Sequence, residues 1–397
     1  MSPSSSRLES REQQSRYVAL DSYRALAALF VVVFHYFYRW SPAANSGNLL
    51  PDLPLLSDSA FVAHGFLGVE FFFIISGFVI ALTLQSTTSL SEFTRKRFAR
   101  LFPAMLVCSV ITYLVVSVLD VPPLSDVKPS DFLPSLTFVS PYVYNKLFGL
   151  NTDWIDGVYW SLFVEVKFYV FASVIYFFSP RQFLRNYLLI SVALCLAFWY
   201  SQIFDFDKVN NLLTQVFYAQ YAGFFLAGIA FQRLFQSGSK FETYSVIVAV
   251  IGVAYSLLLY SFYPAVAMLS SGWYASGLLT LFFLMFFIFV IESPLTKMFE
   301  SRWLAKVGVA SYSLYLLHQN VGVSLLNKIN IYLGTSALWA LPVIALMIAL
   351  SIFLYDYVET PARKMMLRRA SAKSIPQISL RDEYSTDVLH GSRPVIK

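Results

Sequence analysis

The chain has 397 residues, of which 57% are hydrophobic and only 13% are charged, and its formal net charge is +6. So few charged residues cannot cover the surface of a soluble protein of this size, because soluble domains are usually about a quarter charged. The composition therefore excludes soluble domains and predicts an all-α, polytopic bundle of transmembrane helices. The Lys and Arg residues lie in short clusters between apolar runs, a pattern that indicates a membrane surface rather than nucleic acid.

Apolar runs of spanning length follow one another along the chain, each about as long as the roughly 20 residues that cross a bilayer core. They cover residues 18–38, 61–84, 101–120, 158–179, 183–204, 212–235, 243–262, 273–291, 303–327 and 337–357. We therefore expect an N-terminal tail at 1–17, a membrane domain of about ten spans at 18–364, and a polar tail at 365–397. The first run lacks a small-residue cleavage site, so we expect a retained helix rather than a signal peptide.

The loops between these spans differ in their content of Lys and Arg. One set of loops holds only a few of the 29 basic residues: Arg39, Lys128, Lys146, Lys208 and Lys328. Because basic loops stay on the cytoplasmic side, both termini are predicted to be cytoplasmic. The Pro-rich loop at 121–157 then faces outside, where it either covers a substrate site or serves only as a connector.

The first span carries three ionisable residues, Asp21, Arg24 and His35, and such residues at membrane depth usually mark functional sites. Arg24 and His35 are spaced so that they share a helix face, roughly 16 Å apart along the axis. Asp21 lies one turn before Arg24 and can hold its guanidinium. His35 can accept a hydroxyl proton and return it to a leaving group, so we favour a general base over a histidine that only joins helices.

The second and fourth spans also carry acidic and small residues. Glu165 and Lys167 are two apart and point away from each other on a helix, so each needs another partner. Glu165 could orient His35, as the carboxylate of a catalytic triad does, or form a structural ion pair with Arg24. In the second span Glu70 is expected at the membrane interface, and a direct catalytic role is the less favoured alternative. The adjacent Ser76–Gly77 pair is expected to allow close helix packing.

Two further segments have open interpretations. Arg97 and Arg100 lie three apart in a basic cluster with Arg95 and Lys96, and they either bind phosphates or act only as a topology signal. In the ninth span, a stripe of Tyr312, Tyr315 and His318 is expected to serve packing or hydrogen bonding first and substrate contact second. No role is expected for His64 or His390.

Six segments resemble, in chain order, blocks of the acyltransferase-3 family of membrane proteins. They are LDSYRALAALFVVVFH, GVEFFFIISGFVI, RKRFARLFP, VYWSLFVEVKFY, SYSLYLLH and YDYVETPAR, and the resemblance runs from about residue 19 to residue 364. Arg24 and His35 look like the essential pair of this family. Arg97 and Arg100 look like its cytoplasmic Arg-x-x-Arg motif.

The resemblance implies a multi-pass O-acyltransferase of the bacterial inner membrane. It would transfer an acyl group, most often acetyl, from acyl-coenzyme A to a hydroxyl of a surface carbohydrate, such as lipopolysaccharide or exopolysaccharide, or of a lipid-linked glycan. The expected catalytic residues are then His35, Glu165 and Arg24, and the expected substrate-binding residues are Arg97, Arg100 and Asp21. The short tail implies that the chain lacks the additional periplasmic domain of some relatives.

Acyl-coenzyme A is a donor substrate in this interpretation, and no bound cofactor, metal or nucleic acid is expected. The two cysteines, Cys108 and Cys195, lie in separate apolar runs and indicate neither a disulfide nor a metal site. The residues fit direct transfer as well as an acylated His35 intermediate.

Two other classes of function remain open. A secondary transporter could use Asp21, Arg24, His35, Glu165 and Lys167 as an ion or solute pathway. The sequence reveals no inverted repeat or pair of broken helices to favour a transporter. A non-enzymatic membrane scaffold is the third reading, against which the costly buried charges argue.

Overall fold

The computed structural model describes residues 3–44, 48–237, 254, 272–291 and 293–371. Within them every regular element is a helix, which confirms the all-α prediction. The helices are α1 (Pro3–Phe34), α2 (Pro54–Ser57), α3 (Ala60–Ala63), α4 (Gly68–Gln85), α5 (Leu90–Leu119), α6 (Phe132–Thr137), α7 (Pro141–Phe148), α8 (Trp160–Phe178), α9 (Phe183–Ile203), α10 (Asp207–Gln215), α11 (Ala222–Ser237), α15 (Gly272–Val290), α16 (Arg302–Val309), α17 (Ser311–Leu317), α18 (Asn320–Leu333), α19 (Ala340–Leu354) and α20 (Thr360–Ser371). Two π-helical turns, η1 (His35–Arg39) and η11 (Tyr355–Glu359), follow α1 and α19.

Six helical segments of the described residues are long and apolar enough to cross a membrane. They are Val18–Arg39, Gly65–Gln85, Leu90–Leu119, Gly157–Phe178, Pro180–Ile203 and Ala337–Arg368. Each coincides with a predicted apolar run, and together they make the chain a multi-pass integral membrane protein. The predicted span at 243–262 lies outside the described residues except for residue 254.

Two of the predicted continuous spans are broken. The run at 212–235 falls on α10 and α11, and the helical segments Asp207–Gln215 and Ala219–Gln236 meet at a bend of 62°. The run at 303–327 is divided into α16, α17 and α18. Hydrophobicity over a window detects length but not a bend, so the expectation of continuous helices was wrong here. The sequence offered no broken helices in favour of a transporter. The bent pair of α10 and α11 is a broken helix, so that argument against a transporter no longer holds.

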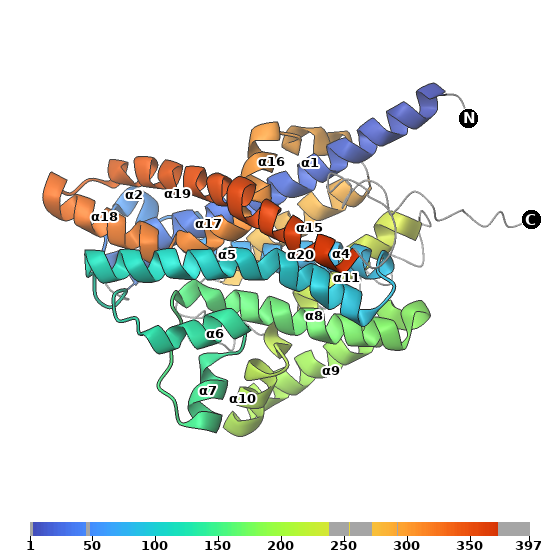
Figure 1. The fold of residues 1–397 in the computed structure, drawn as a ribbon, viewed down its shortest axis with the longest axis horizontal. Coiled ribbons are helices and arrows are strands. Elements are labelled where there is room, and N and C mark those ends of the chain that lie inside the picture. The colour runs from blue at the N-terminus through green and yellow to red at the C-terminus, as the bar shows by residue number, and fades with distance from the viewer. Residues whose placement is uncertain (1–2, 45–47, 238–253, 255–271, 292, 372–397) are drawn as a thin grey trace, which may run out of the picture.

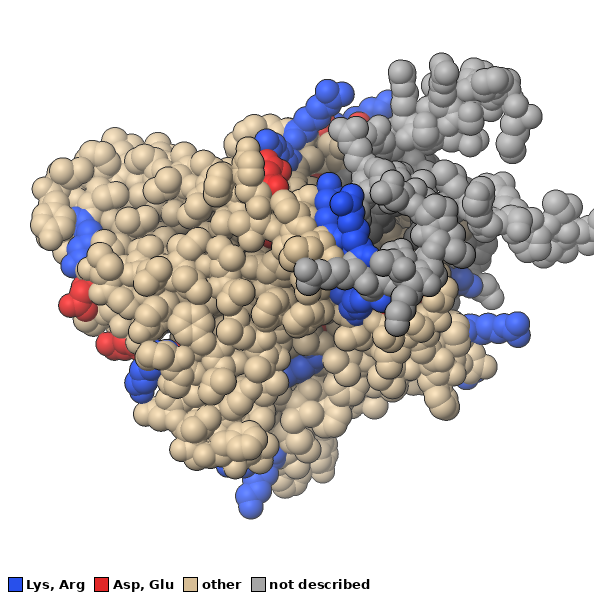
Figure 2. All heavy atoms as spheres, in the orientation of Figure 1, with Lys and Arg blue, Asp and Glu red and all other residues tan. Residues whose placement is uncertain are grey.

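The long helices run roughly parallel to the long axis of the molecule (Figure 1). The described part of the chain begins with α1 and ends with α20 at the same end of this axis, and α5 also begins there. Lys and Arg side chains gather toward this end, whereas the broad middle of the visible face is mostly uncharged (Figure 2). This distribution agrees with the basic loops of the sequence, and the cytoplasmic position of this end remains a prediction.

Helix α17 lies in the interior of the bundle, and all seven of its residues are buried. It packs against α1, α5 and α19. The helix ends at Leu317, the polar residues His318 and Gln319 form a turn, and α18 begins at Asn320. The ends of an interior helix therefore bring polar groups to the centre of the protein.

Helices α4 and α11 cross at a point where only glycine fits. A Cβ atom at Gly77 would lie 2.2 Å from the carbonyl oxygen of Phe225, and one at Gly228 would lie 2.0 Å from that of Ile74. Small residues permit such close approach between membrane helices. The predicted packing role of Gly77 is therefore seen in the structure, whereas Ser76 has a polar role described below.

Replacing Gly77 with Leu should force α4 and α11 apart and destabilise the protein. Overpacking of a filled interior costs about 1–3 kcal/mol, and here the obstacle is backbone, which cannot rotate away. Thermal unfolding in detergent should show a lower midpoint. Gly277→Ala on α15 is the matched control, since a Cβ there meets no described atom within 4 Å. Equal midpoints for Gly77→Leu and wild type would contradict the close crossing.

Candidate active site: a cavity with three arginines and an adjacent histidine pair

A cavity lies among α1, α4, α5, α8 and α17. Its polar lining consists of Arg24, Ser76, Arg97, Arg100, Ser161, Glu165, Tyr169, Ser311, Tyr312 and Tyr315. Four of the predicted site residues, which come from three different helices, thus face one space. Three guanidinium groups and one carboxylate line this space, and the carboxyl groups of Asp21 and Glu359 also interact with Arg24 and Arg100.

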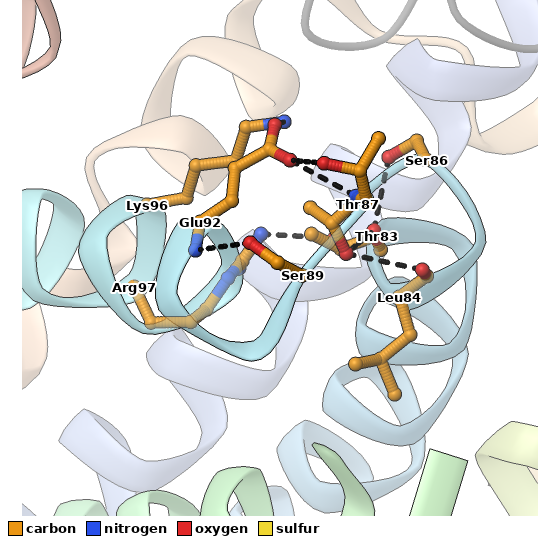
Figure 3. Close-up of polar contacts among 9 residues, drawn as sticks. Thr83, Leu84, Ser86, Thr87, Ser89, Glu92, Lys96 and Arg97 are labelled. Atoms are coloured by element: carbon orange, nitrogen blue, oxygen red, sulfur yellow. Dashed lines mark hydrogen bonds and ion pairs between the residues drawn. The ribbon is translucent and has the colours of Figure 1, made fainter. Parts of the chain in front are cut away.

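Arg97 is held at the corner between α4 and α5 (Figure 3). Ser89 caps α5 by accepting a hydrogen bond from the Glu92 N–H at 3.2 Å. One turn further along α5, the Arg97 guanidinium donates to the Thr83 hydroxyl of α4 at 2.9 Å. It also lies 6.0 Å from the ring centroid of Tyr169. Only 7% of Arg97 is exposed, so its charge is positioned before any ligand arrives.

Arg24 contacts Asp21 within α1, with 3.5 Å between a guanidinium nitrogen and a carboxylate oxygen. This is the local contact that the three-residue spacing predicts. Arg24 is 9% exposed and faces the cavity, so the pair places a partly neutralised cation in its wall.

Glu165 lies in the same cavity but has different partners from those predicted. Its carboxylate accepts hydrogen bonds from the hydroxyls of Ser76 and Tyr169, the latter at 2.6 Å. Within the described residues, neither the predicted contact with His35 nor the alternative ion pair with Arg24 is formed. Tyr169 lies four residues after Glu165 on α8, a spacing that helix geometry brings together, whereas Ser76 reaches Glu165 from α4 and could not be found from spacing.

Lys167 and Glu70 are two further charged residues of the predicted spans. Lys167 donates to the backbone carbonyl of Gln215, beside the bend between α10 and α11. Glu70, expected at the membrane interface, is only 2% exposed and is part of the protein interior. The helices packed around α4 cover it, which the sequence pattern of α4 does not reveal.

His35 ends the regular part of α1, where the helix widens into the π turn η1. Its Nδ1 lies 2.8 Å from the Val31 carbonyl oxygen and 3.3 Å from Nε2 of His318. The two imidazole rings are nearly perpendicular, with centroids 4.8 Å apart. From the sequence, His318 was expected to serve packing or hydrogen bonding first and substrate contact second, and its ring lies within hydrogen-bonding distance of the predicted general base.

His35 does not line the cavity that holds Arg24, although the two residues belong to one helix. Tyr315 connects the two places. Its ring forms part of the cavity wall and packs against His318 with centroids 5.5 Å apart, and its hydroxyl donates to Ser161 at 2.8 Å. Arg24 and His35 were predicted to share one helix face, but they belong to two separate places. Arg24 lines the cavity, whereas His35 pairs with His318, against which the cavity residue Tyr315 packs.

Asp156 is a buried residue that the sequence analysis missed. Its carboxylate accepts hydrogen bonds from the Val158 N–H at 3.1 Å, the Asn320 N–H at 2.9 Å and the Gln319 side chain at 2.8 Å. Burial raises the pKa of Asp156 to about 7, while the three N–H donors act in the opposite direction. One carboxylate therefore caps the start of two helices, the segment leading into α8 and α18.

A signal for Asp156 exists in the sequence. The residue lies two positions before the apolar run that begins at 158, close to where a helix N-cap is expected. Its second partner cannot be found in this way, because the backbone of residue 320 lies 164 positions further along the chain.

The arginine-lined cavity and the histidine pair lie in one multi-pass helical membrane protein. A model of the acyltransferase-3 family, described as an acyltransferase domain, matches residues 17–356. The match covers most of the chain, so the chain belongs to the acyltransferase-3 family, and the predicted enzyme class is confirmed.

Curated relatives agree with this family. The chain is 25% identical to the O-acetyltransferase OatA of Staphylococcus aureus over 90% of its own length and 59% of that protein. It is also 25% identical to the peptidoglycan O-acetyltransferase OatA of Listeria monocytogenes over 88% of its length and 56% of the relative. The chain therefore spans less than two thirds of these relatives. No solved structure matches it.

Proposed function

We propose that the protein transfers an acyl group, in the first instance acetyl, from acyl-coenzyme A to a hydroxyl group of a cell-envelope carbohydrate. The observation that carries the proposal is the convergence of Arg24, Arg97 and Arg100 on one cavity. Coenzyme A bears several phosphate groups, which guanidinium forks bind well. The relatives whose names include O-acetyltransferase supply the reaction type, and the Listeria relative supplies peptidoglycan as the class of acceptor to be tested first.

The donor would enter from the end of the bundle where the Lys and Arg side chains gather (Figure 2). Arg97 and Arg100 lie near the start of α5 and would hold the phosphates. The thinner pantetheine arm would then extend along the cavity past Arg24. Because His35 lies behind Tyr315, delivery of the thioester to His35 requires the Tyr315 side chain to move or the acyl group to pass beside it.

His35 would act as the general base of the transfer. In the direct route the acceptor hydroxyl gives its proton to His35, and the oxygen attacks the thioester carbonyl. The thiolate of coenzyme A then leaves and takes the proton back from the imidazolium. In the alternative route His35 is itself acylated before the acceptor arrives, and the same residues serve both routes.

Turnover by the purified protein tests the proposal. The protein in lipid nanodiscs is given acetyl-coenzyme A labelled in the acetyl group, together with soluble peptidoglycan fragments, and both labelled carbohydrate and free coenzyme A thiol are measured. We expect the two products in equal amounts. Coenzyme A binding without turnover on any carbohydrate would overturn the proposed transfer. Solute flux through proteoliposomes without acyl transfer would instead support the transporter that the bent helix pair leaves open.

A further inference from the structure

We propose that His318 is a positioning residue that, together with the Val31 carbonyl, holds the Nδ1 hydrogen of His35 and so leaves Nε2 of His35 as the basic nitrogen. This inference rests on the proposed function, because it assumes that His35 accepts a proton. It assigns to a second histidine the orienting role that the sequence suggested for Glu165.

The tautomer of His318 follows from its own backbone. Nδ1 of His318 lies 2.8 Å from the carbonyl oxygen of Tyr315. A carbonyl oxygen can only accept, so Nδ1 carries the hydrogen in this contact. In the neutral ring, Nε2 of His318 then has a free lone pair and can act only as an acceptor.

Nδ1 of His35 faces two acceptors. One is the Val31 carbonyl oxygen at 2.8 Å, and the other is Nε2 of His318 at 3.3 Å. Both contacts are satisfied only if Nδ1 of His35 carries a hydrogen that the two acceptors share. Nε2 of the neutral His35 ring is therefore unprotonated, as a general base requires.

His318 is held firmly enough to act on His35. Its backbone carbonyl accepts a hydrogen bond from the Tyr36 hydroxyl at 2.9 Å, so the residue after His35 also binds the break between α17 and α18. Asp156 fixes the other side of this break through Gln319 and the Asn320 N–H. His318 and Asp156 are both 0% exposed.

The arrangement has a consequence for the proton during transfer. The acceptor hydroxyl proton goes to Nε2 of His35, and the new imidazolium keeps its Nδ1 hydrogen between Val31 and His318. Nε2 then gives its proton to the departing thiolate, so His318 gains and loses no proton. The Nδ1 contact strengthens when the ring becomes charged, which favours the transition state over the resting state.

Nitrogen NMR of the resting protein tests the tautomer directly. The chain contains four histidines, so protein labelled with ¹⁵N only in histidine and placed in nanodiscs gives few side-chain signals. The His35→Gln and His64→Gln variants assign two of them. At a pH where the rings are neutral, we expect the protonated-type signal of His35 from Nδ1 and the unprotonated-type signal from Nε2. The opposite tautomer would overturn the proposal, and this measurement needs no substrate.

Two substitutions of His318 separate positioning from packing. His318→Gln keeps an acceptor oxygen near the place of Nε2, whereas His318→Leu has similar size and no acceptor. We expect His318→Leu to lower kcat about tenfold to a hundredfold, with an unchanged KM for the donor, and His318→Gln to regain most of the rate. His64→Leu is the control, because His64 is equally buried but belongs to the end of α3.

The outcomes distinguish this inference from the proposed function. Equal losses in the Gln and Leu variants, accompanied by equally lowered thermal midpoints, would reduce His318 to a packing residue. Normal rates in both variants would overturn the positioning role. A wild-type protein without acyl transfer would remove the proposed function, and the NMR result would still decide the tautomer of His35.

Discussion

Replacing His35 with Ala is expected to lower acyl transfer by about a hundredfold to ten-thousandfold, since that is the usual contribution of a general base. His35 lies in the span that carries Arg24, and its ring contacts the Val31 carbonyl and His318. The substitution removes the ring while leaving the Asp156 network intact. Turnover of labelled acetyl-coenzyme A in nanodiscs measures the effect.

The matched control for His35 is His64→Ala. Nδ1 of His64 lies 2.6 Å from the carbonyl oxygen four residues earlier, as does Nδ1 of His35 at 2.8 Å, and both residues are buried. The two substitutions therefore remove the same ring from the same local geometry. Near-normal turnover in a folded His35→Ala protein would remove the general base from the mechanism. Equal losses in both variants would indicate a stability effect instead.

Replacing both Arg97 and Arg100 with Gln is expected to weaken coenzyme A binding by at least tenfold. A hydrogen bond to a charged group contributes about 1.5–3 kcal/mol, and two guanidinium groups leave the same cavity. The KM for acyl-coenzyme A should rise much more than the KM for the acceptor. Isothermal titration of coenzyme A measures the binding, and thermal unfolding reports whether loss of the Thr83 contact has destabilised the protein.

The double variant Arg95→Gln with Lys96→Gln provides the control for charge. It removes the same net charge from the same cluster, but neither residue lines the cavity, and Arg95 is exposed. The topology reading of the cluster predicts similar behaviour for the two double variants. The donor-binding reading predicts that only the Arg97 and Arg100 variant loses affinity. Unchanged affinity in that variant would reduce the pair to a topology signal and leave the case for His35 standing.

Composition and apolar periodicity were sufficient to predict the helical membrane fold. Six of the predicted runs coincide with helices able to span a bilayer, because the need for about 20 apolar residues acts on each segment separately. Bends obey no such local rule. The break at His318 forms because Asp156 and Tyr36 satisfy polar groups there, and these partners come from other parts of the chain.

The same distinction holds for the candidate site. The contact between Asp21 and Arg24 was predictable because helix geometry alone brings residues three apart together. The partners of Glu165 and His35 on other helices were not, since Ser76 is 89 residues from Glu165 and His318 is 283 residues from His35. Residue types along one helix indicate which groups are costly to bury and so mark functional residues. Which groups meet depends on how the helices pack, and in this protein that packing pairs the predicted base with a histidine rather than with a carboxylate.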